Sequence, residues 1–273
     1  MTSTNSVLRV AVGGFGAIGF ALAKALDDGI DGLALAAVSA RDKKKAADRM
    51  AGFRAPVTVV DLEALAELAD IVVECAPSSV FRSIAEPALK AGRIFVPLSV
   101  GQLLVHDDLK DIAIAHGGRI VVPTGALIGL DAVRAAAEGT IESVTMVTRK
   151  PPRGLMGAPY LEQNNISLEG LNEAKLIFDG SARDGAKGFP ANVNVAAALS
   201  LAGIGPDRTR LQIWADPAVT RNTHRIEVEA DSARFSMSIE NVPSEENPKT
   251  GKITALSAIA CLRGLVAPMR VGT

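Results

Sequence analysis

The feature that most constrains this chain is a glycine-rich turn between an apolar run and an amphipathic stretch near the N-terminus. Residues 7–12 predict a buried strand, and residues 20–26 predict a helix. Between them Gly14, Gly16 and Gly19 spell G-x-G-x-x-G, in the strand–turn–helix context that gives this motif its meaning. Gly14 permits a tight turn, Gly16 lets a pyrophosphate approach the backbone, and Gly19 lets the helix pack closely on the strand.

The helix that follows this turn offers free N–H groups and the positive end of its dipole to phosphate groups. The turn therefore predicts dinucleotide binding, although a tight turn that binds nothing would share its glycines. The residues predicted to contact the cofactor here are Gly14, Phe15, Gly16, Ala17, Ile18 and Gly19.

Further apolar runs alternate with helical stretches up to about residue 123. This alternation predicts an α/β fold, in which a parallel sheet is covered by helices on both faces. The expected strands are residues 33–38, 57–60, 70–75, 94–97 and 119–122. Ligands of such sheets bind at the carboxyl ends of the strands. Cys75, Ala76 and Pro77 follow one strand and are therefore predicted near the cofactor, while Asp61 is expected to cap a helix.

The pattern changes after Asp131, where half-polar strands replace fully apolar ones. The segments 225–229 and 234–240 alternate apolar and polar residues, which is typical of an antiparallel sheet with one exposed or partner-facing side. We therefore expect a second, α+β domain for substrate binding and dimerisation. The predicted division is residues 1–126 plus 250–273 for the dinucleotide-binding domain and residues 127–249 for the second domain.

Composition and charge restrict the possible partners. The chain has 273 residues and a net charge of −1, so nothing indicates a nucleic-acid partner. No apolar run reaches a membrane-spanning length, and the first six residues do not resemble a signal peptide. Cys75 and Cys261 show no metal-ligand spacing, so we expect no metal and two reduced thiols in a cytoplasmic protein.

The second expected strand ends in Ser39-Ala40-Arg41-Asp42. A site that prefers NAD usually has an acidic residue at the tip of this strand, bound to the ribose 2′-hydroxyl. Here Ser39 and Arg41 could hold a 2′-phosphate, Arg41 could be solvated, or Asp42 could serve NAD from a longer loop. The cofactor is therefore predicted to be NADP or NAD, with NADP favoured.

Of the three histidines, His224 is the candidate for catalysis. His106 and His116 have structural explanations, the latter because it lies near the end of a predicted helix. His224 comes from a polar loop that enters a strand, so its imidazole could project into a cleft. A neutral imidazole suits the acceptance of a proton that is released as a hydride leaves.

Several long stretches resemble the L-aspartate dehydrogenase family. The resemblance covers essentially the whole chain and is far more specific than the glycine motif. The matching segments are residues 123–131, 148–152, 189–197, 202–209, 215–217, 222–224, 243–250 and 270–273.

This resemblance implies a Rossmann domain and an α/β domain that carries the substrate and forms a homodimer. It implies NAD(P)-dependent oxidation of L-aspartate to iminosuccinate, which hydrolyses to oxaloacetate and ammonia, and the reverse reductive amination. In some organisms the iminosuccinate would supply NAD biosynthesis. The catalytic histidine of the family falls on His224 and its cofactor-contacting alanine on Ala126. Its asparagine falls on Asn192 or Asn194, either of which could instead cap a helix.

Two substrate carboxylates need cationic or hydrogen-bonding partners. Lys150, Asn194 and Thr223 are the predicted substrate residues, and further cations are Arg149, Lys187 and Arg221. Two alternatives stay open: a reductase of another imine or semialdehyde, of homoserine or dihydrodipicolinate type, and a non-catalytic NAD(P) sensor.

Overall fold

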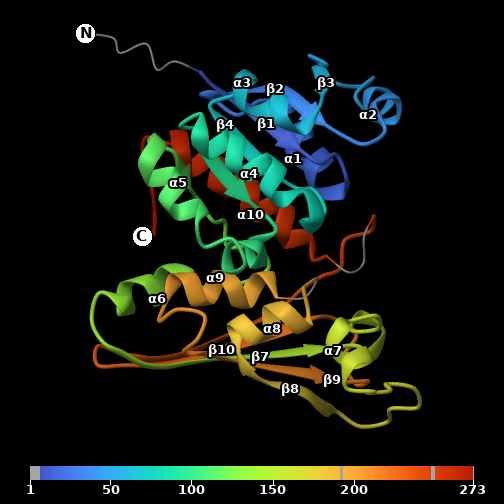
Figure 1. Cartoon of the computed structure of the whole chain (residues 1–273), viewed down its shortest axis with the longest axis vertical. Helices are drawn as coiled ribbons and strands as arrows, with labels where there is room; N and C mark the ends of the chain where they lie inside the picture. The colour runs from blue at the N-terminus through green and yellow to red at the C-terminus, as the bar shows by residue number, and fades with distance from the viewer. Residues whose placement is uncertain (1–6, 191–192, 247–249, 273) are drawn as a thin grey trace. The chain divides into compact units, whose positions relative to one another are not determined.

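The computed structural model describes residues 7–190, 193–246 and 250–272. The contacts between Cα atoms divide the chain into two compact units. The N-terminal unit comprises Met1–Pro123 with Ala255–Arg270, and the C-terminal unit comprises Thr124–Thr254 with Val271–Thr273 (Figure 1).

The N-terminal unit is built on a six-stranded parallel sheet with the order β3-β2-β1-β4-β5-β6. This is the strand order of dinucleotide-binding folds, in which the chain reverses direction beside β1. The predicted parallel α/β sheet is thereby confirmed. The strands are β1 (Leu8–Gly13), β2 (Leu33–Ser39), β3 (Thr58–Val60), β4 (Ile71–Glu74), β5 (Ile94–Pro97) and β6 (Arg119–Ile120).

Helices cover both faces of this sheet, because its strands carry apolar side chains on both faces. Ala11, Val72 and Phe95 share a core with α3, α4 and α5, whereas Val10 and Val73 share another with α1 and α10. The helical segments are α1 (Ala17–Asp28), α2 (Lys43–Arg49), η1 (Leu62–Ala64), α3 (Leu65–Leu68), η2 (Ser78–Val80), α4 (Phe81–Lys90), η3 (Val100–Leu104), α5 (Leu109–His116) and α10 (Lys252–Val266).

The C-terminal unit contains a five-stranded sheet with the order β11-β10-β7-β9-β8. The strands are β7 (Ile141–Lys150), β8 (Lys175–Ser181), β9 (Thr209–Ala215), β10 (Thr223–Ala230) and β11 (Arg234–Glu240). The expected antiparallel pairing is confirmed for β10 and β11, but the sheet as a whole is mixed, because β7 and β9 pair in parallel at its centre. The chain between these two strands contains helices and β8, which gives the length that a parallel crossover requires.

Helices of the C-terminal unit lie along one face of this sheet, as α6, α8 and α9 show in Figure 1. Alternate residues of β7, β9 and β10 are buried beneath them, and the intervening residues are more exposed. The helical segments are α6 (Leu130–Ala137), η4 (Pro152–Gly154), α7 (Pro159–Gln163), α8 (Ala182–Gly188) and α9 (Asn194–Ala202).

Two helix starts differ from the sequence prediction. The side chain of Asp61 makes no capping hydrogen bond to η1 and instead pairs with Lys43, at 2.8 Å between carboxylate oxygen and Nζ. Asn194 is the first residue inside α9 and not its cap, which is Val193.

Candidate functional site

A groove of about 960 Å³ lies at the carboxyl ends of β1, β2 and β4. Its position matches the crevice in which open parallel sheets bind dinucleotides. Among the residues predicted to contact the cofactor, those that line it are Gly14, Phe15, Gly16, Ser39, Arg41, Cys75, Ala76 and Pro77.

The three motif glycines have different surroundings. Gly14 has a φ of +102°, and a Cβ there would lie 2.6 Å from the backbone of Cys75. A Cβ on Gly19 would lie 2.0 Å from the carbonyl oxygen of Gly14, so the close approach of α1 to the turn requires glycine. A Cβ on Gly16 would meet nothing within 4 Å. Gly16 therefore leaves an open place at the start of α1, which fits the pyrophosphate of a dinucleotide.

Ala17 and Ile18, also predicted to contact the cofactor, lie inside α1. Ala17 is its first residue, and the side chain of Ile18 packs against the apolar core. Only the backbone N–H groups of these two residues are suited to meet a phosphate.

The residues predicted to discriminate between NAD and NADP follow or end β2 and lie beside the groove. Ser39 is buried and Arg41 is exposed, and both line the groove. Asp42 caps α2, because its Oδ1 accepts a hydrogen bond of 2.9 Å from the N–H of Lys45. The carboxylate of Asp42 is thereby engaged away from a ribose, while the guanidinium of Arg41 remains a suitable partner for a phosphate.

Glu74, at the end of β4, was missed from the sequence because it continues an apolar strand. Its buried carboxylate accepts hydrogen bonds from the N–H groups of Ala76, at 2.9 Å, Leu98, at 3.2 Å, and Ser99, at 2.9 Å. Burial raises the pKa of Glu74, and these hydrogen bonds act against that rise. Glu74 thus ties together the loops that follow β4 and β5 beside the cofactor groove. Burial also raises the pKa of the adjacent Cys75 thiol well above its usual value, which favours packing over reactivity.

A separate cavity of about 90 Å³ lies within the C-terminal unit. It combines the predicted catalytic histidine with two of the three predicted substrate residues. Its lining residues are Ala126, Lys150, Asn194, Val195, Asn222, His224, Asn241, Thr250, Gly251 and Thr254.

His224 is the second residue of β10 and is only 3 % exposed. Its Nδ1 lies 3.1 Å from Oγ1 of Thr148, the residue opposite it on β7. Burial and the charge of Lys150 lower the pKa of His224 to about 3. The imidazole is therefore neutral at physiological pH, as a proton acceptor must be.

Lys150 ends β7, two residues beyond Thr148, and therefore projects from the same face of the sheet. It is 5 % exposed, and burial lowers the pKa of its ammonium group to about 8. A lysine with this pKa is mostly charged at neutral pH and loses its proton in mildly basic solution. It can therefore attract a substrate carboxylate where few water molecules compete.

The structure does not bring every predicted substrate residue to this cavity. Thr223 precedes His224 on β10, so its side chain points to the opposite face of the sheet, beside Arg149. Arg149 pairs there with Asp216, at 3.0 Å, and stacks on the ring of Trp214. Strand alternation thus places Thr223 outside this cavity lining, and its role toward the substrate stays a prediction.

Two further candidate cations also lie outside the cavity lining. Lys187 is exposed on α8 and pairs with Asp184, and Arg221 is exposed before β10. Asn192, predicted to contact the cofactor, lies outside the described residues. Asn194 and Ala126 do line the cavity.

Two residues of the cavity carry no local sequence signal. Asn222 precedes β10, and Asn241 follows the neighbouring strand β11. The backbone N–H of Asn241 donates to the carbonyl oxygen of Asn222, at 2.9 Å, and extends the pairing of these strands. Only the register of β10 and β11 reveals that Asn241 approaches the histidine.

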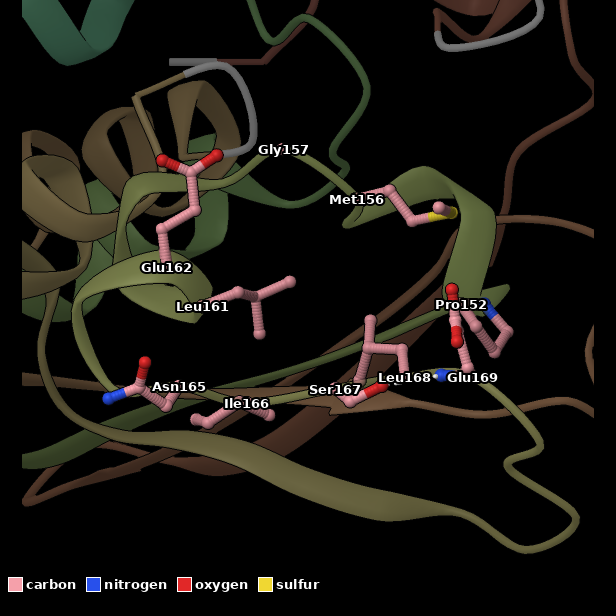
Figure 2. Close-up of a pocket in the computed structure, with 10 residues that line it drawn as sticks. All are labelled: Pro152, Met156, Gly157, Leu161, Glu162, Asn165, Ile166, Ser167, Leu168 and Glu169. Atoms are coloured by element: carbon pink, nitrogen blue, oxygen red, sulfur yellow. Dashed lines mark hydrogen bonds between the residues drawn. The ribbon is translucent and has the colours of Figure 1, made fainter.

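A second groove of the C-terminal unit, of about 500 Å³, is formed by η4, α7 and the loop after α7 (Figure 2). Apolar side chains such as Met156, Leu161 and Leu168 line it together with Glu162 and Glu169. Because its lining includes two carboxylates and no basic side chain, this groove is unsuited to a dicarboxylate.

The other histidines have structural partners. His106 stacks on Phe81, and Nδ1 of His116 lies 3.0 Å from the carbonyl oxygen of Ile112 at the end of α5. Among the described residues, no group of three or more His, Cys, Asp or Glu side chains could hold a metal ion. Within the same residues, no helix is long and apolar enough to cross a bilayer.

Two family models match the chain, one in each half. Residues 14–123 match the model described as "Homoserine dehydrogenase, NAD binding domain", and residues 131–265 match "Aspartate dehydrogenase, C-terminal". The fold and the groove at its strand ends, together with these matches, define an NAD(P)-dependent dehydrogenase.

Curated relatives identify the family. The chain is 63 % identical to the L-aspartate dehydrogenase of Bradyrhizobium diazoefficiens, over 99 % of this chain and 96 % of the relative. It is 57 % identical to L-aspartate dehydrogenase 3 of Bordetella bronchiseptica, over 99 % of this chain and the whole of the relative. The crystal structure of aspartate dehydrogenase from Thermotoga maritima has the same fold, with a TM-score of 0.74 at 22 % identity over 97 % of this chain and 99 % of that one. The chain belongs to the L-aspartate dehydrogenase family.

Proposed function

We propose that this protein oxidises L-aspartate to iminosuccinate with NAD(P), and catalyses the reverse reductive amination of oxaloacetate with ammonia. The observation that carries this proposal is the juxtaposition of a neutral His224 and a buried Lys150 in one cavity of the C-terminal unit. A proton acceptor and a cation are the two groups that an amino dicarboxylate requires. Iminosuccinate formed in this way would be available to a pathway of NAD biosynthesis.

His224 is proposed to accept the proton that the substrate ammonium loses. Its pKa of about 3 in the free protein is low because of burial and the charge of Lys150. A substrate with two carboxylates brings negative charge into the same cavity, which raises the pKa of the imidazole. His224 is thereby a stronger base with substrate bound than in the free enzyme, and in the reverse direction it returns the proton.

Lys150 is proposed to bind one substrate carboxylate, with Asn194 as a hydrogen-bond donor beside it. The ammonium of Lys150 loses solvation on burial, so an anionic partner gains more from it than from an exposed lysine. A bound nicotinamide would supply the acceptor for the hydride that leaves the substrate Cα. The turn at Gly14, Gly16 and Gly19 is proposed to hold its pyrophosphate, with Ala126 contacting the cofactor as in the family.

NADP is the proposed preferred cofactor. Asp42 is engaged as a helix cap, whereas Ser39 and Arg41 line the groove where a 2′-phosphate would lie. In fluorescence titrations, Arg41→Ala should weaken NADPH binding about tenfold and NADH binding by less than twofold, consistent with one charge-assisted contact. An equal loss for both cofactors would contradict this preference.

The activity is tested by following absorbance of the reduced nicotinamide with oxaloacetate, in the presence and absence of ammonium and with NADH and NADPH compared. Consumption that requires ammonium is expected. Consumption without ammonium, or only with another imine or semialdehyde, would instead indicate a related reductase. Cofactor binding without turnover would indicate a sensor.

We also propose that the enzyme is a cytoplasmic homodimer. The face of the C-terminal sheet opposite α9 carries Trp214, stacked with Arg149, and the exposed side chain of Leu176 on β8. Such a face suits pairing with a second copy. Light scattering after size-exclusion chromatography should give a mass twice that of one chain, which is 28.3 kDa. Trp214→Glu should lower the measured mass to that of a single chain.

A further inference from the structure

Asn241 lies in the His224 cavity and is 4 % exposed. Its side-chain amide has a defined orientation, because Nδ2 donates a hydrogen bond of 3.1 Å to the carbonyl oxygen of Ala126. A carbonyl oxygen can only accept, so the amide nitrogen must face it. The amide oxygen Oδ1 is therefore the atom turned away from Ala126.

Oδ1 of Asn241 is buried and accepts no hydrogen bond from any part of the chain that the structure describes. A buried acceptor without a donor is destabilising, so such atoms in native proteins usually serve a ligand, a water molecule or a strained element. Asn241 is one of the residues that line the cavity, so a polar group bound there would lie beside its amide.

Gly251 has no side chain to crowd this oxygen. A Cβ on Gly251 would lie 3.0 Å from Oδ1 of Asn241, closer than such contacts normally come. The cavity measures about 90 Å³, which corresponds to about three water molecules. The cavity therefore has room for a polar group beside the amide of Asn241.

The chemistry of the cavity selects the group that Oδ1 would meet. Carboxylates only accept hydrogen bonds, so neither substrate carboxylate can satisfy this oxygen. A substrate ammonium has three N–H donors, and the proposed reaction requires one of them to face His224. A nitrogen in this cavity has further N–H groups for Asn241.

We propose that Asn241, with Gly251 beside it, forms the subsite for the amino nitrogen of the substrate, and for ammonia in the reverse direction. This inference rests on the proposed function. Oδ1 of Asn241 accepts one N–H of the nitrogen while His224 faces another. The subsite thus distinguishes an amino dicarboxylate from a dicarboxylate that lacks the amino group.

The test compares binding of L-aspartate and succinate to the full-length enzyme saturated with NADPH, by isothermal titration calorimetry. The two ligands share both carboxylates and differ in the amino group. Asn241→Ala should weaken L-aspartate binding about tenfold, as expected for one charge-assisted hydrogen bond, and leave succinate and NADPH binding within twofold of wild type.

A second variant retains the amide and fills its surroundings. Gly251→Ala keeps Asn241 and its bond to Ala126 but crowds Oδ1, so it should also lower the preference for L-aspartate over succinate. Asn164→Ala serves as the matched control, because this exposed asparagine bonds only to Tyr160 on α7 in the contacts described. The control should bind both ligands as wild type does.

An equal loss of affinity for L-aspartate and succinate, or a loss of affinity for NADPH, would overturn the subsite. It would show that Asn241 only holds the backbone of Ala126 in place. An unchanged preference in both variants would show that Oδ1 serves a water molecule, and would overturn it as well. A wild-type enzyme that shows no ammonium-dependent turnover contradicts the proposed function itself. Wild-type turnover with unchanged variants contradicts the subsite alone.

Discussion

Oγ1 of Thr148 lies 3.1 Å from Nδ1 of His224, and both side chains are buried between paired strands. A hydroxyl can donate or accept, so this contact holds the ring plane and is compatible with either neutral tautomer. Only the tautomer with a proton on Nδ1 leaves Nε2 free to accept one. In that tautomer the imidazole donates to Thr148, whose hydroxyl accepts, as the orienting partners of catalytic histidines do.

Replacing Thr148 by valine should lower kcat for L-aspartate oxidation about five- to thirtyfold. Valine preserves the shape of threonine and removes a hydrogen bond worth about 1 to 2 kcal/mol, which corresponds to that change in rate. Thr148→Ser keeps the hydroxyl and should retain most of the activity. Steady-state kinetics with both variants, alongside thermal melting, checks this; equal losses in the two would argue against a role for the hydroxyl.

Binding of a dicarboxylate should weaken above about pH 8. The pKa of Lys150 is lowered to about 8, so the free enzyme loses this positive charge as pH rises through that value. The Kd of succinate should be constant below pH 8 and then rise by up to about tenfold per pH unit, because one proton is linked to binding. Lys150→Arg keeps its charge and should bind succinate without this decline. Calorimetric titrations between pH 6 and 10 measure both.

Acid should destabilise the protein through His224. Its pKa falls from 6.5 to about 3 on folding, so the unfolded chain binds more protons between these values. Stability therefore rises with pH across this window and is progressively lost as pH falls from about 6.5 toward 3. His224→Asn has no imidazole to protonate at this position, so its free energy of unfolding should fall less than that of wild type between pH 7 and pH 5. Urea unfolding at the two pH values gives the comparison; identical pH dependence in wild type and variant would contradict it.

Gly16 and Gly19 should respond differently to alanine. A methyl group on Gly19 collides with the carbonyl oxygen of Gly14, and overpacking of this kind costs about 1–3 kcal/mol or more. Gly16 has a φ of −76°, which alanine adopts readily, and open space around it. Gly16→Ala should thus keep its melting temperature and bind NAD(P)H at least about tenfold more weakly, because the methyl group keeps the pyrophosphate from the backbone. Gly19→Ala should melt at lower temperature.

The sequence predicts the N-terminal unit well because its signals are local. Apolar strands alternate with helices, and the glycine turn lies where β1 meets α1. The parallel pairing of β7 with β9 could not be predicted, since residue alternation defines the faces of a strand but not its neighbours. The same limit applies to Thr223, because only the position of the strand shows that its side chain lies on the face opposite that of His224.

The candidate site was predictable where a residue has distinctive chemistry, as His224 and Lys150 have. Thr148 and Asn241 are common residue types, and they reach His224 through strand pairings that span 76 residues for the former. Glu74 was hidden for another reason. A carboxylate in an apolar strand signals a function only when its hydrogen-bond partners are known, and these come from the chain after β5.

The carboxylate of Glu74 has a thermodynamic consequence for cofactor binding. Because it fastens the N–H groups of Ala76, Leu98 and Ser99, the loops after β4 and β5 have their shape before any dinucleotide arrives. Ordering a loop upon association consumes free energy that would otherwise contribute to affinity. In this protein that conformational entropy is lost during folding, so the cofactor meets a preorganised surface and its binding free energy is not reduced by loop closure.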